Sequence, residues 1–249
     1  MKAVRFAWLP LAALAVGALA SVAQAQDEQE ARMRAALASP ERSAENKARD
    51  EARKPIETIK FVGIKTGDTV VDVFAAGGWF TEVLSAAVGP KGKVYSQNPA
   101  FMTQRGGDEF KKREDAMVKR LGNVEPIHGD LPDGIAGKAD AAITALNFHD
   151  MHNRSEEAGV QFLKGIYDSL KPGGVLGLID HVGIAGQNNA EFHRVEPDAA
   201  KAALKKVGFV IEAESDILKN PADDHKKGVR DPSIRYHTDQ FLIRARKPK

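Results

Sequence analysis

Short apolar, β-branched runs alternate with amphipathic stretches over most of the chain beyond residue 60. The runs that predict strands are residues 69–74, 93–97, 124–128, 139–146, 175–179, 209–214 and 238–246. Helices are expected between most of them, at residues 81–88, 108–121, 156–170 and 197–207. This alternation is typical of a parallel sheet with helices on both faces, so we expect an α/β fold, a three-layer αβα sandwich.

The end of the chain departs from this alternation. No helical stretch separates the runs at 209–214 and 238–246, and a parallel return needs a dozen or more ordered residues that are usually helical. We therefore predict a seven-stranded, mostly parallel sheet with an antiparallel last strand. The segment 215–237 between these strands is polar and rich in Pro, Asp and Lys, which indicates a long loop or lid.

The first 25 residues predict a secretory signal peptide. Lys2 and Arg5 precede an uncharged run at 6–20, and the small-residue pattern Ala23-Gln24-Ala25 predicts cleavage after Ala25. The run is shorter than the ~20 apolar residues that cross a bilayer, so we expect cleavage and no stable membrane anchor. The sequence thus predicts a periplasmic or secreted protein.

Two segments follow before the first strand. Residues 26–53 are charged and rich in Ala, which predicts an N-terminal helical segment of one or two surface helices; a partly disordered leader is the alternative. Pro55 then opens a short amphipathic helix at 55–62, which Gly63 ends. We place the main domain at 54–249.

Charge and composition exclude several functions. The chain has 36 Lys and Arg against 34 Asp and Glu, and residues 1–25 contain two of the basic residues and no acidic one. The processed chain is therefore balanced, which disfavours a nucleic-acid partner. Because there is no cysteine, disulfides, thiolate metal sites and cysteine nucleophiles are excluded.

The most informative segment is the turn after the first predicted strand. The strand runs into Ala75-Ala76-Gly77-Gly78 and then a helix, so a ligand can approach the backbone at the carboxyl edge of the sheet. The dinucleotide fingerprint G-x-G-x-x-G is absent. The segment resembles the first motif of class I S-adenosylmethionine-dependent methyltransferases, an acidic residue followed by glycines at alternate positions. Asp72, Ala76 and Gly78 fall on that frame, and Phe74 stands where its first glycine is expected.

Three further segments match this family in order and spacing. Asn98 follows the second strand, where the family usually has an acidic residue for the ribose hydroxyls, and Asp130 resembles the aspartate that faces the adenine amino group. The turn at 170–176 resembles the one before the fifth strand. The resemblance covers residues 54–249 and implies a Rossmann-like fold with S-adenosylmethionine as cofactor. The cofactor-binding residues that it implies are Asp72, Phe74, Ala76, Gly77, Gly78, Asn98, Asp130 and Asn147.

Histidines after the fourth strand are the candidates for catalysis. Methyl transfer needs an aligned nucleophile and in some cases a base, so we predict His149, Asp150 and His152 as catalytic residues. Capping of the following helix is the structural alternative. A second alternative makes His149 and His152 metal ligands, helped by His181, His193 or Glu196.

The sequence is compatible with two functions. The first is a methyltransferase acting on an unknown small molecule or on a side chain of an exported protein. The chain also resembles a group of exported bacterial proteins predicted to be methyltransferases. This resemblance lies in Arg53-Lys54-Pro55, the glycine turn and the Thr238-Asp239-Gln240-Phe241 ending. The second is a non-catalytic periplasmic ligand-binding protein on the same scaffold, in which aromatic residues near the turn stack on a flat ligand.

Overall fold

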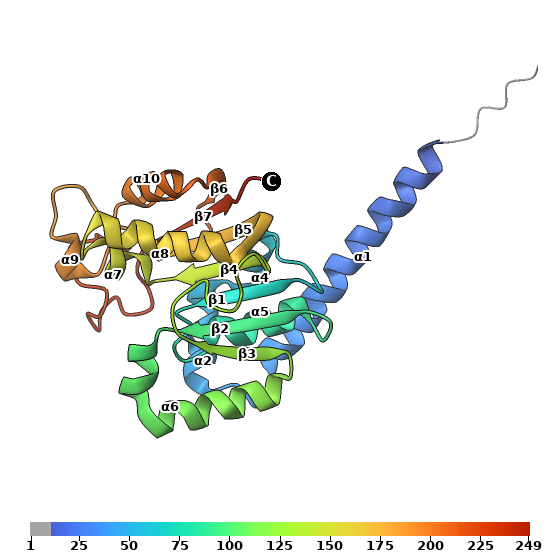
Figure 1. Ribbon diagram of the computed structural model, residues 1–249, viewed down its shortest axis with the longest axis horizontal. Coiled ribbons are helices and arrows are strands. Elements are labelled where there is room, and N and C mark those ends of the chain that lie inside the picture. The colour runs from blue at the N-terminus through green and yellow to red at the C-terminus, as the bar shows by residue number, and fades with distance from the viewer. Residues whose placement is uncertain (1–10) are drawn as a thin grey trace, which may run out of the picture.

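The structure is a computed structural model that describes the backbone of residues 11–249 and the side chains of residues 23–249. In this part of the chain, seven strands form one sheet in the order β3-β2-β1-β4-β5-β7-β6 (Figure 1). The strands are β1 (Thr69–Val73), β2 (Lys93–Asn98), β3 (Val124–His128), β4 (Ala139–Ala145), β5 (Leu170–His181), β6 (Val210–Ser215) and β7 (Gln240–Arg246). Strands β1 to β5 pair in parallel, whereas β7 runs antiparallel between β5 and β6. The predicted fold class, with its antiparallel last strand, is confirmed.

Helices pack on both faces of the sheet. One face carries α1 (Leu11–Ala38), α4 (Pro55–Val62) and α5 (Trp79–Val88), and the other carries α7 (Phe148–His152), α8 (Glu156–Ser169) and α10 (Pro197–Val207). Successive strand residues point to opposite faces: Val70 joins the core under α4 and α5, and its neighbour Val71 joins the core under α8 and α10. The remaining helices are α2 (Ala44–Ala48), α3 (Asp50–Arg53), α6 (Ala100–Leu121) and α9 (Asn189–Phe192).

Two elements are longer than their sequence patterns predict. The helix expected at 108–121 begins at Ala100, because Pro99 provides an extended N-cap, and its backbone kinks at Gly107. The strand expected at 175–179 extends over Leu170–His181, because its ends pair with Ala139 of β4 and Gln240 of β7. The extension of the strand depends on partners distant in sequence, which a local apolar pattern does not report.

The N-terminal segment is docked on the domain. The side chain of Gln29 donates hydrogen bonds to the carbonyl oxygens of Ile64 and Ala87, both at 3.0 Å, and Met33 is buried in the core. In the structure, residues 26–53 contain the C-terminal part of α1 together with α2 and α3, and α1 packs on the domain. Residues 1–10 of the predicted signal peptide lie outside the described residues. Over residues 11–249, no helix is both long and apolar enough to cross a membrane.

Candidate functional site

The turn between β1 and α5 has an alternating backbone conformation. Phe74, Ala76 and Gly78 have φ values of 55°, 49° and 77°, in the left-handed region. This region costs a residue with a side chain about 1–2 kcal/mol, so glycine is the residue best suited to these alternate positions. Phe74 and Ala76 adopt it nonetheless, which requires that neighbouring groups hold the turn in place.

Two amides at the end of β2 hold the turn. The Asn98 side-chain oxygen accepts a hydrogen bond from the backbone N–H of Ala76 at 2.8 Å, and the Gln97 side-chain oxygen accepts one from Phe74 at 3.1 Å. Asn98 is buried, and its Nδ2 has no partner among the described residues. The oxygen that the sequence assigned to a ribose hydroxyl therefore fixes the turn, and Nδ2 is the free polar atom of this side chain.

Asp72 is buried directly below the turn. Its carboxylate accepts a hydrogen bond from the Thr81 hydroxyl at 2.6 Å. Burial raises the pKa of Asp72 to about 7, and the bond from Thr81 and the positive charge of Arg53 only partly oppose this shift. Asp72 thus ties the end of β1 to the first turn of α5.

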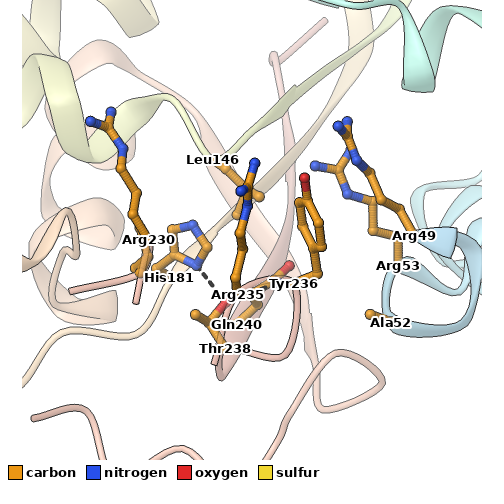
Figure 2. Close-up of a pocket in the computed structure, with 11 residues that line it drawn as sticks. Arg49, Ala52, Arg53, Leu146, His181, Arg230, Arg235, Tyr236, Thr238 and Gln240 are labelled. Carbon is orange, nitrogen blue, oxygen red and sulfur yellow. Dashed lines mark hydrogen bonds between the residues drawn. The ribbon is translucent and has the colours of Figure 1, made fainter. Parts of the chain in front are cut away.

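Two cavities lie at the carboxyl edge of the sheet. The smaller, about 200 Å³, is bounded by the β1 turn, and the larger, about 310 Å³, is bounded by the loop before β7 (Figure 2). Arg49, Arg53 and Leu146 line both, so the two cavities adjoin. This is the edge at which open α/β sheets bind ligands.

The predicted cofactor-binding residues separate into two groups. Those that line the smaller cavity are Asp72, Phe74, Ala76, Gly77 and Asn147. The others do not line it: Gly78 is the N-cap of α5, Asn98 lies buried behind the turn, and Asp130 is exposed beyond β3. The β1 turn therefore brings five of the eight predicted residues to one cavity, and Gly78, Asn98 and Asp130 lie outside it.

His149 lies in a buried ion pair instead of in a cavity. Its Nδ1 donates to Asp180 at 2.7 Å, and its Nε2 lies 3.3 Å from Asp150. Although burial disfavours the imidazolium, these two carboxylates raise the pKa of His149 to about 10. The ring lines neither cavity. It is a cation at neutral pH, so it already carries a proton and cannot accept another as a general base.

The other two predicted catalytic residues have different surroundings. Asp150 also accepts from His193 Nδ1 at 2.9 Å, and potential ligand atoms of His149, Asp150 and His193 lie within 4.8 Å of one another, close enough to hold a metal ion. His152 is not part of this cluster. Its ring stacks on Phe148, with centroids 5.4 Å apart.

His181 is the histidine that lines the larger cavity. Its Nδ1 is hydrogen-bonded to the Thr238 hydroxyl at 2.7 Å (Figure 2), and its backbone N–H donates to Asp180. Burial lowers the pKa of His181 to about 3, so the ring is neutral. Within residues 23–249, Nε2 makes no hydrogen bond.

Arginines and a tyrosine that sequence patterns did not single out complete the larger cavity. Arg49, Arg53, Arg235 and Tyr236 converge there from the N-terminal helices and from the loop before β7 (Figure 2). The guanidinium of Arg53 lies 4.8 Å from the centroid of the Trp79 ring. Burial and the charge of Arg49 lower the pKa of Arg53 to about 10. The only sequence signal for these residues was the Arg53-Lys54-Pro55 resemblance.

No protein-family model matches the chain. A curated relative, the ubiquinone/menaquinone biosynthesis C-methyltransferase UbiE of Pseudomonas fluorescens (strain SBW25), is 23% identical over 195 residues. The match covers 76% of this chain and 66% of the relative, just under two thirds of its length.

Solved structures show the same fold. A S-adenosylmethionine-dependent methyltransferase from Aquifex aeolicus superposes with a TM-score of 0.55 and 20% identity, over 80% of this chain and 98% of that one. The [4+2]-cyclase SpnF has a TM-score of 0.58 and 17% identity, over 79% and 80% of the two chains. The chain thus shares the fold of these structures and has a distant sequence similarity to a C-methyltransferase.

Proposed function

We propose that the protein is a S-adenosylmethionine-dependent methyltransferase whose smaller cavity takes the methionine half of the cofactor and whose larger cavity takes the methyl acceptor. The observation that carries this proposal is the open turn at Phe74–Gly78 beside a second, polar cavity. The curated relative is a methyltransferase by name, which supports the same reaction class.

The residues at the smaller cavity fit this cofactor. A Cβ added at Gly77 would meet no atom within 4 Å, so there is open space above the turn. Arg53 has no carboxylate partner among the described side chains and suits the carboxylate of the methionine part. Asn98 Nδ2 is a buried, unpaired donor that suits a ribose hydroxyl oxygen. When bound, the cofactor supplies an electrophilic methyl group.

His181 is the histidine best placed to contact and orient the acceptor. It is neutral, it lines the larger cavity, and Thr238 fixes its orientation through Nδ1. While the acceptor atom attacks the methyl group and the bond from that group to the sulfur of the cofactor breaks, Nε2 of His181 would hold the acceptor by a hydrogen bond. With a pKa of about 3 the ring is too weak a base to keep the proton of the acceptor, which would pass to water. His149 serves as a positioning residue in this scheme, since it holds the Asp180 carboxylate that also accepts the His181 N–H.

The acceptor is proposed to be a small molecule or a side chain of an exported protein. We also propose that the protein acts outside the cytoplasm, on the support of the charged start, uncharged run and Ala23-Gln24-Ala25 pattern. Fractionation of cells that express a tagged chain tests this location. A full-length product confined to the cytoplasm would contradict it.

Calorimetry with S-adenosylmethionine and S-adenosylhomocysteine tests the cofactor assignment. The full chain is expected to bind both, and Arg53→Ala is expected to weaken binding about tenfold, because a charge-assisted hydrogen bond is lost. Arg105→Ala, an exposed arginine on α6, is the matched control and should bind like the unmodified protein. Absence of heat at near-millimolar cofactor would overturn the proposal.

One observation favours the alternative of a non-catalytic ligand-binding protein. The Phe74 ring lines the smaller cavity and packs edge-on against Phe162, with centroids 5.2 Å apart. In a methyltransferase the ring only narrows the cavity, so Phe74→Gly should keep or improve S-adenosylhomocysteine binding. Loss of that binding without loss of stability would favour a protein that stacks its ligand on Phe74.

A further inference from the structure

The wall of the larger cavity is strongly cationic. Four of its eleven lining residues are arginines, namely Arg49, Arg53, Arg230 and Arg235, and no Asp or Glu lines it (Figure 2). In a chain whose basic and acidic residues nearly balance, this is a local excess of positive charge. An enclosed surface of this kind attracts anions.

Two of these arginines meet at one aromatic ring. The guanidinium carbons of Arg49 and Arg235 lie 5.1 and 4.9 Å from the centroid of the Tyr236 ring, which Figure 2 shows between them. Cation–π contacts place a guanidinium but leave its N–H donors free to bind. The Nε of Arg49 is buried without a partner among the described residues.

Three of the four arginines at the cavity lack the carboxylate partners that several other arginines of the chain have. Arg42, Arg194 and Arg246 each form an ion pair with Asp or Glu. Within residues 23–249, Arg53, Arg230 and Arg235 form none, and Arg49 pairs only with the exposed Glu45. Their free donors form a fork geometry that matches carboxylate and phosphate oxygens.

We infer that the larger cavity binds a small acceptor through a carboxylate or phosphate group, held by Arg49 and Arg235. This inference rests on the proposed function, because it assigns the substrate class of the acceptor cavity. The volume of about 310 Å³ accommodates one small molecule. His181 lies on the same wall, so the anionic group orients the remainder of the molecule within reach of a neutral imidazole.

Calorimetry on the full chain with three probes tests the inference. Benzoate and phenyl phosphate carry the two candidate anions, and benzamide is the uncharged counterpart of benzoate. At least one anion is expected to bind ten or more times more tightly than benzamide, and the tighter of the two identifies the group. Equal binding of all three, or no binding of either anion, would overturn the inference.

Variants locate the anion site. Arg235→Gln removes the charge at an exposed loop residue and should weaken binding of the preferred anion about tenfold or more. Arg105→Gln removes the charge of an exposed arginine outside the cavity and should leave it unchanged. Thermal melting verifies that both variants are folded. Equal loss in both, or unchanged affinity in Arg235→Gln, would contradict a site at this cavity.

The same samples separate this inference from the proposed function. Binding of S-adenosylhomocysteine without preference for anions would sustain the methyltransferase and overturn the acceptor class. Anion binding that Arg235→Gln weakens, without any binding of S-adenosylhomocysteine, would overturn the methyltransferase and sustain an anion-binding cavity.

Discussion

The side-chain oxygen of Asn98 accepts a hydrogen bond of 2.8 Å from the backbone N–H of Ala76, in the middle of the turn after β1. Ala76 has a φ of 49°, so this bond stabilises a backbone conformation that alanine seldom adopts. A residue at the end of one strand thereby shapes the turn that follows the neighbouring strand and lines the smaller cavity.

Asn98→Ala should destabilise the protein by about 1 kcal/mol, because it removes the hydrogen bond that the N–H of Ala76 donates to the Asn98 side chain. S-adenosylhomocysteine affinity should fall as the turn loosens. Urea denaturation and calorimetry measure the two effects. Asn98→Asp retains an oxygen that faces Ala76, and it should keep the turn better than the alanine variant. An alanine variant as stable as the unmodified protein would contradict this role.

Gly78→Ala should lower stability, whereas Gly77→Ala should lower cofactor affinity. At Gly78 an added Cβ meets the Met117 side chain. A residue with a side chain also pays about 1–2 kcal/mol for a φ of 77°, so the stability of the protein falls. At Gly77 the Cβ meets no protein atom within 4 Å but enters the smaller cavity, so stability is kept and cofactor affinity falls. Melting temperatures and calorimetric affinities distinguish the two. Equal stability of both variants would contradict the geometry of the turn.

The His149 ion pair should make stability depend on alkaline pH. The folded-state pKa of about 10 lies above the ordinary value of 6.5, so the stabilisation is fully present below pH 6.5 and is lost as the pH rises through 10. Asp180 and Asp150 are the carboxylates facing the ring, with His181 and His193 beside it.

Thermal melting between pH 7 and 10 measures this loss. The melting temperature of the unmodified protein should fall more steeply than that of His149→Gln, which has no imidazolium to deprotonate. His237→Gln replaces an exposed histidine and should follow the unmodified curve. Parallel curves for the unmodified protein and His149→Gln would show that the ring is already neutral at pH 7.

Arg194→Met should cost about 3–5 kcal/mol, because it leaves the carboxylate of Asp223 buried and unpaired. Arg194 donates to both oxygens of Asp223, at 2.9 and 3.0 Å, and so anchors the loop that lines the larger cavity. Lys206→Ala removes an exposed pair with Glu156 and should cost less than about 1 kcal/mol. Urea denaturation compares the two, and similar costs would refute the anchoring role.

Local patterns in the sequence were sufficient to predict the architecture. Apolar runs of strand length and amphipathic stretches predicted the order of strands and helices. The absence of a helix between residues 214 and 238 required the antiparallel last strand, which β7 confirms. These features depend on neighbouring residues, and the printed sequence reports them directly.

The candidate site was predicted only in part. The turn at Phe74–Gly78 was recognised because strand, turn and helix are contiguous, and the smaller cavity lies there. The sequence predicted His149 as a catalytic residue and offered His181 only as a possible metal ligand, because an isolated histidine at a strand end carries no signal of its surroundings. Their positions differ because Asp180 and Asp150 enclose one ring in an ion pair, whereas Thr238 holds the other at the larger cavity.

By itself the sequence determined the layers, the direction of the last strand and the position of the glycine turn after β1. Only the tertiary structure decided which charges share a cavity with that turn. Arg49 and Arg235 belong to segments without apolar periodicity. They meet at Tyr236 because the docked N-terminal helices and the loop anchored by Arg194 cover the same edge of the sheet. The periodicity of apolar residues predicts which face of one element is buried. Contacts between side chains of different elements depend on how those elements pack together.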